Sequence, residues 1–200
     1  MRWIKGFGRN PWPRDMAIRV NDHPQQLHQL LFVRHAWSIA AEADVPELWP
    51  VPDPGTSKMP DPPGATVWEE RWQAAWKRAW DWFDIEDHSQ QELATPAFIR
   101  EATRPGQDLN PVIPPFWTSE YGMDGLDYAA FSAWDSCLIP SFPSTAERRS
   151  LPDLIPAWES GIVLPYADYF AKRISRRHLV VSAVTRNDEE SYGRALRTRM

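Results

Sequence analysis

Cysteine is nearly absent from this chain of 200 residues, in which Cys137 is the only one. A lone cysteine excludes an intramolecular disulfide and the cysteine-rich zinc sites. It is also typical of a reducing compartment, so we expect a cytoplasmic protein with Cys137 buried as a small apolar side chain. Long apolar runs are lacking as well, so the sequence predicts no membrane-spanning helix and no membrane partner.

Familiar catalytic motifs are missing too. The sequence holds no glycine-rich phosphate loop, no GxSxG, no HExxH and no internal repeat. Residues 84–88 (DIEDH) bring three carboxylates and a histidine together, a set that a hard cation could use. Ser89 and Glu92 form a capping box directly after them, however, and acidic residues favour a helix N-terminus. We therefore predict neither a metal site nor a cofactor.

Tryptophan is what the chain has in excess, with twelve residues, and five of them fall between 66 and 83. At about 100° per residue, the apolar side chains of this stretch share one face of a helix: Trp68, Trp72, Ala75, Trp76, Ala79, Trp80, Trp82 and Phe83. Thr66 and Glu69 have the spacing of a capping box, and Lys77 and Asp81 that of an ion pair on the polar face. An indole buries a large apolar area and also needs an acceptor for its N–H. We predict a central core helix here, with an aromatic platform open to a ligand as the alternative.

Two further helices are indicated by apolar spacing and capping residues. The first covers residues 22–43, with Asp22 as its cap and Pro24 in its first turn. The second covers residues 125–138, with Asp124 as its cap and aromatic residues at three-residue intervals.

The C-terminal region has a different pattern. Residues 161–164 and 178–184 are β-branched runs and are the best strand candidates in the chain. Residues 166–175, between them, have a helical aromatic face, and 187–199 predict a last helix capped by Asn187. The sequence therefore predicts an α+β, mainly helical protein. It has a Trp-rich helical core, a small C-terminal sheet and long Pro-rich connections.

Proline outnumbers glycine by twenty to nine, and seven of the prolines lie in residues 45–65. This segment can be neither a helix nor a central strand, so we expect an extended surface loop with Trp49 as an anchor. Residues 1–21 are expected to form an N-terminal arm that carries Trp3 and Trp12 among glycine, proline and arginine. Residues 22–200 then form a single globular domain.

The net charge of −5 is unevenly distributed along the chain. Residues 1–20 carry +4, residues 166–200 carry +4, and the middle carries −13. Arg176 and Arg177 lie in the basic C-terminal part. The basic ends can fold back on the acidic body or bind an outside partner. Because the overall charge is negative, a nucleic acid is the less favoured partner, although the basic termini allow one.

One short string suggests a specific chemistry. The residues from Leu31 to Ser38 (LFVRHAWS) resemble the signature of histidine phosphatases, in which an arginine and a nucleophilic histidine follow an apolar strand. The resemblance implies that Arg34 would bind a phosphoryl group and that His35 would take it covalently. It covers eight residues, the segment here is predicted to be helical, and Ala183 stands where the family's second histidine is expected.

Three functions follow from these observations. The first is a non-catalytic, cytoplasmic protein-binding or assembly protein, of the immunity type or a complex subunit, since tryptophan and arginine are the usual anchors of interfaces. Its partner-binding residues are predicted to be Trp3, Trp12, Trp49, Arg176 and Arg177. The second is a phosphoryl-transfer hydrolase that uses Arg34 and His35. The third is a tryptophan platform for carbohydrate or nucleic-acid bases.

Overall fold

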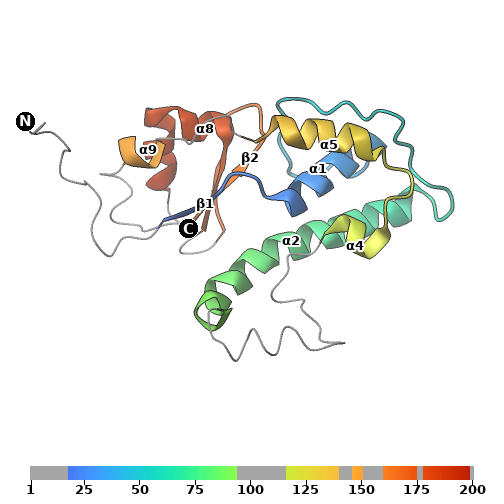
Figure 1. Ribbon diagram of the computed structural model, residues 1–200, viewed down its shortest axis with the longest axis horizontal. Coiled ribbons are helices and arrows are strands. Elements are labelled where there is room, and N and C mark those ends of the chain that lie inside the picture. The colour runs from blue at the N-terminus through green and yellow to red at the C-terminus, as the bar shows by residue number, and fades with distance from the viewer. Residues whose placement is uncertain (1–17, 94–115, 140–145, 151–159, 175–177, 199–200) are drawn as a thin grey trace, which may run out of the picture.

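The computed structural model describes residues 18–93, 116–139, 146–150, 160–174 and 178–198. Within residues 84–93 it describes the backbone alone. In chain order the elements are β1 (Arg19–Asn21), α1 (Gln25–Trp37), α2 (Ala65–Leu93), α4 (Trp117–Tyr121), α5 (Tyr128–Cys137), α6 (Ala146–Arg149), β2 (Ser160–Leu164), β3 (Ala171–Arg173), β4 (His178–Ser182), α8 (Ala183–Asn187) and α9 (Glu189–Leu196). Helices α1, α2 and α5 lie on one side of a small sheet (Figure 1). The predicted α+β, mainly helical fold is confirmed.

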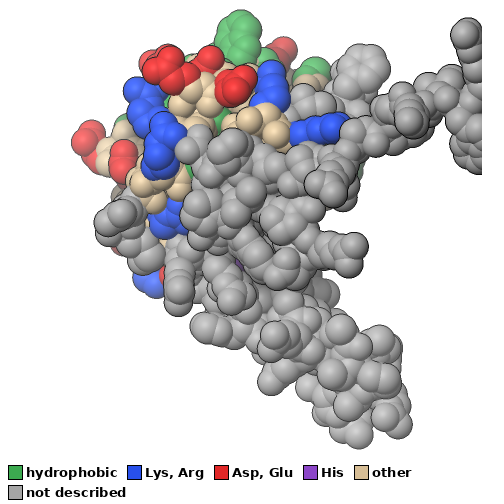
Figure 2. All heavy atoms as spheres, turned by 90° about the vertical axis from the view of Figure 1, so that its left-hand side faces the viewer, with side chains coloured by type: hydrophobic (Ala, Val, Ile, Leu, Met, Phe, Trp, Pro, Cys, Tyr) green, Lys and Arg blue, Asp and Glu red, His purple; other side chains and the backbone are tan. Residues whose placement is uncertain are grey.

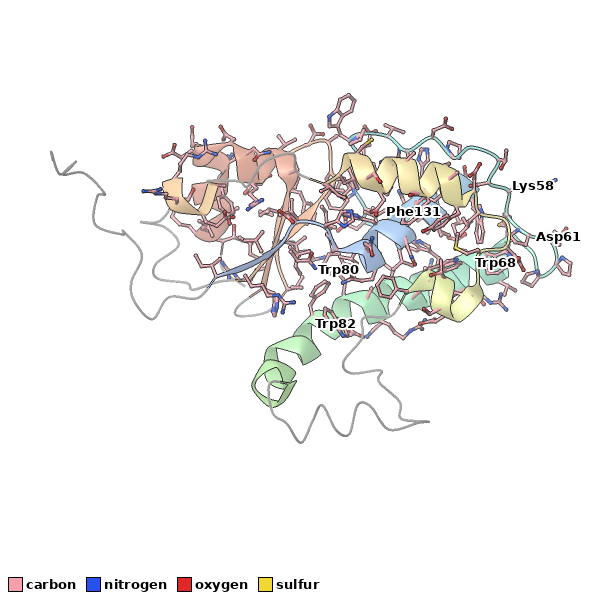
Figure 3. The ribbon with its side chains drawn as sticks, in the orientation of Figure 1. Lys58, Asp61, Trp68, Trp80, Trp82 and Phe131 are labelled. Carbon is pink, nitrogen blue, oxygen red and sulfur yellow. The ribbon has the colours of Figure 1, made fainter. Side chains whose placement is uncertain are left out.

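Helix α2 contains the tryptophan-rich stretch, and its apolar face is turned inward as predicted. Trp68, Trp72, Ala75, Ala79 and Phe83 are buried, and the remaining tryptophans of the helix are partly buried against them. Figure 3 shows Trp68 near Lys58 and Asp61 of the proline-rich segment, with Trp80 and Trp82 farther along the helix. The indoles therefore form the core of the helical half.

The predicted boundaries of this helix are wrong at both ends. It begins at Ala65, so Thr66 lies inside the first turn rather than at the cap. It also continues unbroken to Leu93, so the new helix expected after Ser89 does not form. The predicted pair of Lys77 and Asp81 is confirmed, with 2.5 Å between Nζ and Oδ2 on the exposed face.

Helix α1 is shorter than predicted and more completely buried. It ends at Trp37 instead of Ala43, because Ser38 and Ala40 both adopt positive φ values of 53°. The Ser38 and Ile39 N–H groups close the helix end by donating to the His35 and Arg34 carbonyls. At the other end Pro24 is the cap residue in place of Asp22.

Helix α5 packs beside α1 and is capped by Asp127, not by Asp124 as predicted. The Asp127 carboxylate accepts the Ala130 N–H and also the N–H and hydroxyl of Thr56. It therefore ties the helix start to the proline-rich segment. Cys137, in the last turn, is exposed, which corrects the expectation that it would be buried. Its thiol donates to the Ala133 carbonyl at 3.2 Å, a contact on the exposed side of the helix.

Residues 45–65 form the extended surface connection predicted from their prolines, and we call this segment the strap. The strap crosses the outer side of α5 and returns to the start of α2 (Figure 1). Its first part pairs with the sheet region, since Leu48 forms a bridge with Tyr166 and the Trp49 N–H donates to the Pro165 carbonyl at 2.8 Å. Its later part is held by the Lys58 N–H, which donates to the Gly125 carbonyl.

The sheet has four strands in the order β1-β2-β4-β3. Strands β1, β2 and β4 are parallel, and β3 runs antiparallel at the edge. The predicted strands at 161–164 and 178–184 are confirmed, although the second ends at Ser182. The predicted helix over 166–175 is wrong, because Ala171–Arg173 pairs with β4. Strand β1 lies in the last part of the predicted arm, and residues 1–17 of that arm lie outside the described residues.

Both faces of the sheet are covered by apolar clusters. Ile162, Leu164 and Val180 belong to the cluster of the tryptophan-rich helices. Val163, Leu179 and Val181, which alternate with them, belong to a second cluster with Tyr192 and Leu196 of α9 and Ala146 of α6. Residues 178–182 are all buried, because a strand covered on both faces has no solvent side.

The C-terminal helices are joined to α6 by a buried ion pair. Arg186 of α8 donates to both carboxylate oxygens of Glu147, at 2.7 and 3.0 Å, and Tyr192 donates its hydroxyl to Glu147 as well. Asp188 caps α9 by accepting the Ser191 N–H, so the predicted cap at Asn187 is one residue early. The basic charge of Arg186 is therefore neutralised inside the fold.

Surface charges at this end of the molecule are mixed in sign. Figure 2, which faces the left-hand side of Figure 1, shows acidic and basic side chains interspersed among the described residues there. Arg194 lies over the ring of Tyr169 at 4.6 Å from its centroid. None of the helices in the described ranges combines the length and apolar character needed to cross a bilayer.

Candidate functional site

Four of the five predicted partner-binding residues cannot be placed. Trp3, Trp12, Arg176 and Arg177 lie outside the described residues. The acidic stretch at residues 84–88 lies in α2, but its side chains are outside the described part as well. Trp49 is the predicted binding residue that the structure does place.

Trp49 is exposed on a backbone that is fixed on both sides. The residue is 67% exposed, whereas the other tryptophans that the structure describes are buried or partly buried. Its own N–H is bonded to Pro165, and the carbonyl of Pro50 accepts the Trp134 indole N–H at 2.7 Å. Leu48, the preceding residue, is buried against Tyr166. The indole is therefore held outside the fold by well-anchored neighbours.

Further apolar residues are exposed in the same proline-rich segment and just after α5. Val51 follows Pro50 and is exposed, and Ile139 is exposed just after the end of α5, the helix that carries Trp134. We call Trp49, Val51 and Ile139 the Trp49 region. Because Pro50 is bonded to Trp134, this region lies where the start of the strap meets the C-terminal part of α5.

The strap is fastened by indole N–H groups. Trp68 donates to the Pro60 carbonyl at 2.9 Å, and Trp134 donates to that of Pro50. Trp37 donates to the Gly125 carbonyl, which also accepts the Lys58 N–H. A proline-rich backbone has carbonyl acceptors but few N–H donors, and an indole has a donor only. The tryptophans and prolines of this chain therefore complement each other chemically.

Arg34 and His35 lie on the last turn of α1, which is a helix as the sequence predicted. The Arg34 Nε atom donates to the Ala40 carbonyl at 3.2 Å and so takes part in closing the helix end. His35 is half-buried on the next position, about 100° further around the helix. Neighbouring helical side chains diverge, which gives the phosphatase-type use of this pair no geometric support.

A cluster that the sequence did not predict brings together His23, His28 and Asp135. His23 precedes α1, His28 lies in α1, and Asp135 lies in α5. The distance from Asp135 Oδ1 is 2.8 Å to His28 Nδ1 and 3.1 Å to His23 Nε2. One nitrogen of each histidine and a carboxylate oxygen all lie within 4.8 Å of one another. We call these residues the His–His–Asp cluster.

Burial governs the protonation of this cluster. Desolvation lowers the pKa of His28, against the opposing effect of the hydrogen bond that its ring N–H donates to Asp135, so the imidazole is neutral near neutral pH. Burial alone would raise the pKa of Asp135, but the hydrogen bonds that its carboxylate accepts from His28 and Gln25 leave that pKa below its ordinary value. Asp135 is therefore an ionised carboxylate beside a neutral, buried imidazole.

The second nitrogen of His28 has no partner. His28 is fully buried, and its Nε2 atom has no hydrogen bond, a feature it shares with three other buried polar side-chain atoms among the described residues. Chemically, the cluster can serve as a hydrogen-bonded clamp between α1 and α5 or as a set of ligands for a cation. No local sequence motif links His28 to Asp135, which is 107 residues away.

An apolar recess between α1, α4 and α5 is too small to bind a substrate. It is lined mainly by Phe32, Trp117 and Phe131, and its cavity volume of about 10 Å³ is that of about one water molecule. The features with functional potential among the described residues are therefore the Trp49 region and the His–His–Asp cluster. Comparison of the chain with protein-family models, with curated proteins and with solved structures finds no match in any of the three.

Proposed function

We propose that this protein is a non-catalytic binding or assembly protein that recognises another protein through the Trp49 region. The observation that carries the proposal is the exposure of Trp49 on a backbone fixed by hydrogen bonds to Pro165 and Trp134. Because the backbone on both sides of the indole is already fixed, binding has to order little more than the Trp49 side chain itself.

The surroundings of Trp49 support the same function. Val51 and Ile139 add exposed apolar surface, and the strap supplies an extended, proline-rich backbone. Exposed Cys137, the only cysteine of the chain, fits a reducing compartment, so we place this function in the cytoplasm.

The other two functions have weaker support among the described residues. A stacking platform needs two or more open tryptophan faces along one groove, and Trp49 is the exposed tryptophan in the part of the chain that the structure describes. For the hydrolase, Arg34 is engaged at the end of α1 and His35 points elsewhere on the helix.

The proposal is tested by comparative capture from a native lysate. The wild-type protein, Trp49→Ser and Tyr128→Ser are immobilised, and the captured proteins are identified by mass spectrometry. Tyr128 is the matched control, because it is 65% exposed at the opposite end of α5. We expect at least one protein to be retained by the wild type and by Tyr128→Ser but lost with Trp49→Ser.

The folded state of the variants must be checked in the same experiment. Trp49 contributes little to the core, so Trp49→Ser should change the free energy of unfolding by no more than about 0.5 kcal/mol. Sedimentation of the purified chain separates self-association from binding of a different protein. Capture of the same set of proteins by the wild type and by a folded Trp49→Ser variant contradicts the proposal.

A further inference from the structure

The His–His–Asp cluster has the composition and spacing of a cation site. Its three side chains come from the segment before α1, from α1 and from α5, and they converge on one carboxylate oxygen. A tetrahedral ion at about 2.0–2.2 Å from each ligand holds its donor atoms about 3.3–3.6 Å apart. Asp135 Oδ1 lies 2.8 Å from His28 and 3.1 Å from His23, and the three ligand atoms lie within 4.8 Å of one another, so the ligands need only move apart by a few tenths of an ångström about the carboxylate.

The nitrogen of His28 that faces the carboxylate is Nδ1, so Nδ1 is the atom that would bind an ion. The other ring nitrogen, Nε2, points away from Asp135 and has no hydrogen-bond partner although the residue is fully buried. Gln25 adds a hydrogen bond to Asp135 Oδ2 at 3.4 Å, so the protein supplies further polar groups around the carboxylate instead of apolar packing. His23 Nε2 also lies 3.2 Å from the backbone carbonyl oxygen of Asp135.

We propose that His23, His28 and Asp135 bind one divalent transition-metal ion of the zinc class. Two imidazole nitrogens and one carboxylate oxygen form a mixed ligand set of the kind that zinc, cobalt and iron accept, whereas calcium and magnesium prefer oxygen ligands alone. The ion takes the place of the protons that otherwise join the histidines to Asp135.

Access to this site is from the side of His23. The side chain of His23 is 22% exposed, whereas those of His28 and Asp135 are almost entirely covered. With three protein ligands, at least one coordination position of the ion stays open, and it faces the solvent side. Because the ligands come from different elements, binding also links α1 to α5 and stabilises the folded state by mass action.

Cobalt titration of the full chain tests the site. The protein is first treated with a chelator, and Co²⁺ is then added while the visible absorption and the thermal unfolding temperature are recorded. We expect visible absorption bands that saturate at one equivalent of Co²⁺ and that disappear when Zn²⁺ is added. The Tm should also rise with metal concentration.

Variants decide whether the ion binds where we propose. His23→Gln removes a partly exposed ligand, so the protein should still fold while its affinity for the metal falls by about tenfold or more. His35→Gln is the matched control, because His35 lies on α1 outside the cluster, and its affinity should equal that of the wild type. Asp135→Asn should bind more weakly still, provided that its circular dichroism is native.

Two results would overturn the inference. One is no saturable binding of Co²⁺ or Zn²⁺ by the wild-type protein. The other is unchanged affinity in a folded His23→Gln variant, which would place the ion elsewhere on the chain. Neither result bears on the Trp49 region, because Trp49 contributes no ligand to this cluster.

Discussion

At the scale of single residues, the indole N–H explains why this core uses tryptophan. Trp72 donates to the Leu30 carbonyl at 2.7 Å, and Trp68 and Trp134 donate to carbonyls of the strap. A leucine core would fill the same space but would leave the strap without these donors. The sequence predicts that the α2 indoles turn inward and need acceptors. It does not identify the acceptors, because Pro50 and Trp134 are 84 residues apart.

The residues of the candidate sites were predictable to different degrees. Trp49 could be singled out because a tryptophan between prolines has no helix or strand to bury it. His28 could not, because it lies on a helix whose sides are nearly all covered, and helical periodicity then fails to separate buried from exposed positions. Its partner Asp135 belongs to a different element, and only the packing of α5 on α1 brings the two together.

Asp127 provides a pH-dependent test at this scale. Hydrogen bonds from Thr56 and Ala130 lower its pKa to about 2 in the folded protein, against about 3.9 in an unfolded chain. Its contribution to stability is therefore complete above about pH 4 and is lost as the pH falls from about 4 to about 2. In Asp127→Asn this part of the pH dependence should be weaker, because the amide cannot ionise.

The measurement is the free energy of unfolding by denaturant at several pH values between 2 and 7. Asp81→Asn is the control, because Asp81 is exposed and paired only with Lys77, and such surface pairs contribute little. The control should keep the wild-type slope between pH 4 and pH 2. An equal slope in Asp127→Asn would show that the contacts with Thr56 and Ala130 do not hold the carboxylate in its ionised form.

At the scale of elements, the errors in the predicted structure have physical causes. Residues 166–175 have aromatic residues at helical spacing, yet Ala171–Arg173 completes the sheet by pairing with β4, and Tyr166 pairs with Leu48 of the strap. Long-range pairing overrode local preference in this segment. The early end of α1 has a local cause, because Ser38 and Ala40 adopt left-handed conformations that neither residue type signals strongly.

The attachment of the strap to the α4–α5 connection depends on Gly125. This residue has a φ of +74°, and a Cβ atom there would lie 2.3 Å from the Lys58 carbonyl oxygen and 2.7 Å from Pro60 Cδ. Gly125→Ala should therefore push the strap away from α5 and lose the bonds that Lys58 and Trp37 make to the Gly125 carbonyl. We expect a loss of about 3 kcal/mol or more in the free energy of unfolding.

Gly122→Ala is a matched control for this loss. Gly122 has nearly the same φ, +77°, but a Cβ atom there would meet nothing within 4 Å. It should cost only the backbone strain of an alanine at φ +77° and ψ −165°, a conformation used almost only by glycine, about 1–3 kcal/mol. The difference between the two variants, measured by denaturant unfolding, then isolates the contact with the strap. Equal losses would mean that the strap does not press on the α4–α5 connection.

At the scale of the whole molecule, the sheet is shared between two apolar clusters. Its alternate residues face the tryptophan-rich helices on one side and α6 and α9 on the other. The sequence predicted the helical core and the small sheet separately. It did not predict that β1, from the N-terminal part, would lie parallel to β2 and join the two ends of the chain. That contact depends on the chain topology, and no local pattern in residues 19–21 predicts it.

A shared sheet predicts that both halves unfold together. Leu196 is buried in the second apolar cluster, formed by α6, α9 and one face of the sheet, which we call the α9 cluster. This cluster contains none of the described tryptophans. Leu196→Ala should lower the free energy of unfolding by about 2–5 kcal/mol. Leu179 and Val180 are neighbours on β4, and their side chains belong to the two clusters on opposite faces of the sheet. Loss of the α9 cluster therefore exposes the same sheet on which the tryptophan-rich core packs.

The check is to follow denaturant unfolding of Leu196→Ala by tryptophan fluorescence and by far-UV circular dichroism. Both signals should shift to lower denaturant by the same amount, although the buried and partly buried tryptophans that the structure describes lie in the other cluster. Val184→Ala, at an exposed position of α8, should leave both midpoints near those of the wild type. A shift in circular dichroism without a shift in fluorescence would show that the α9 cluster unfolds on its own. The sheet would then be a boundary between two independently stable halves instead of the element that couples them.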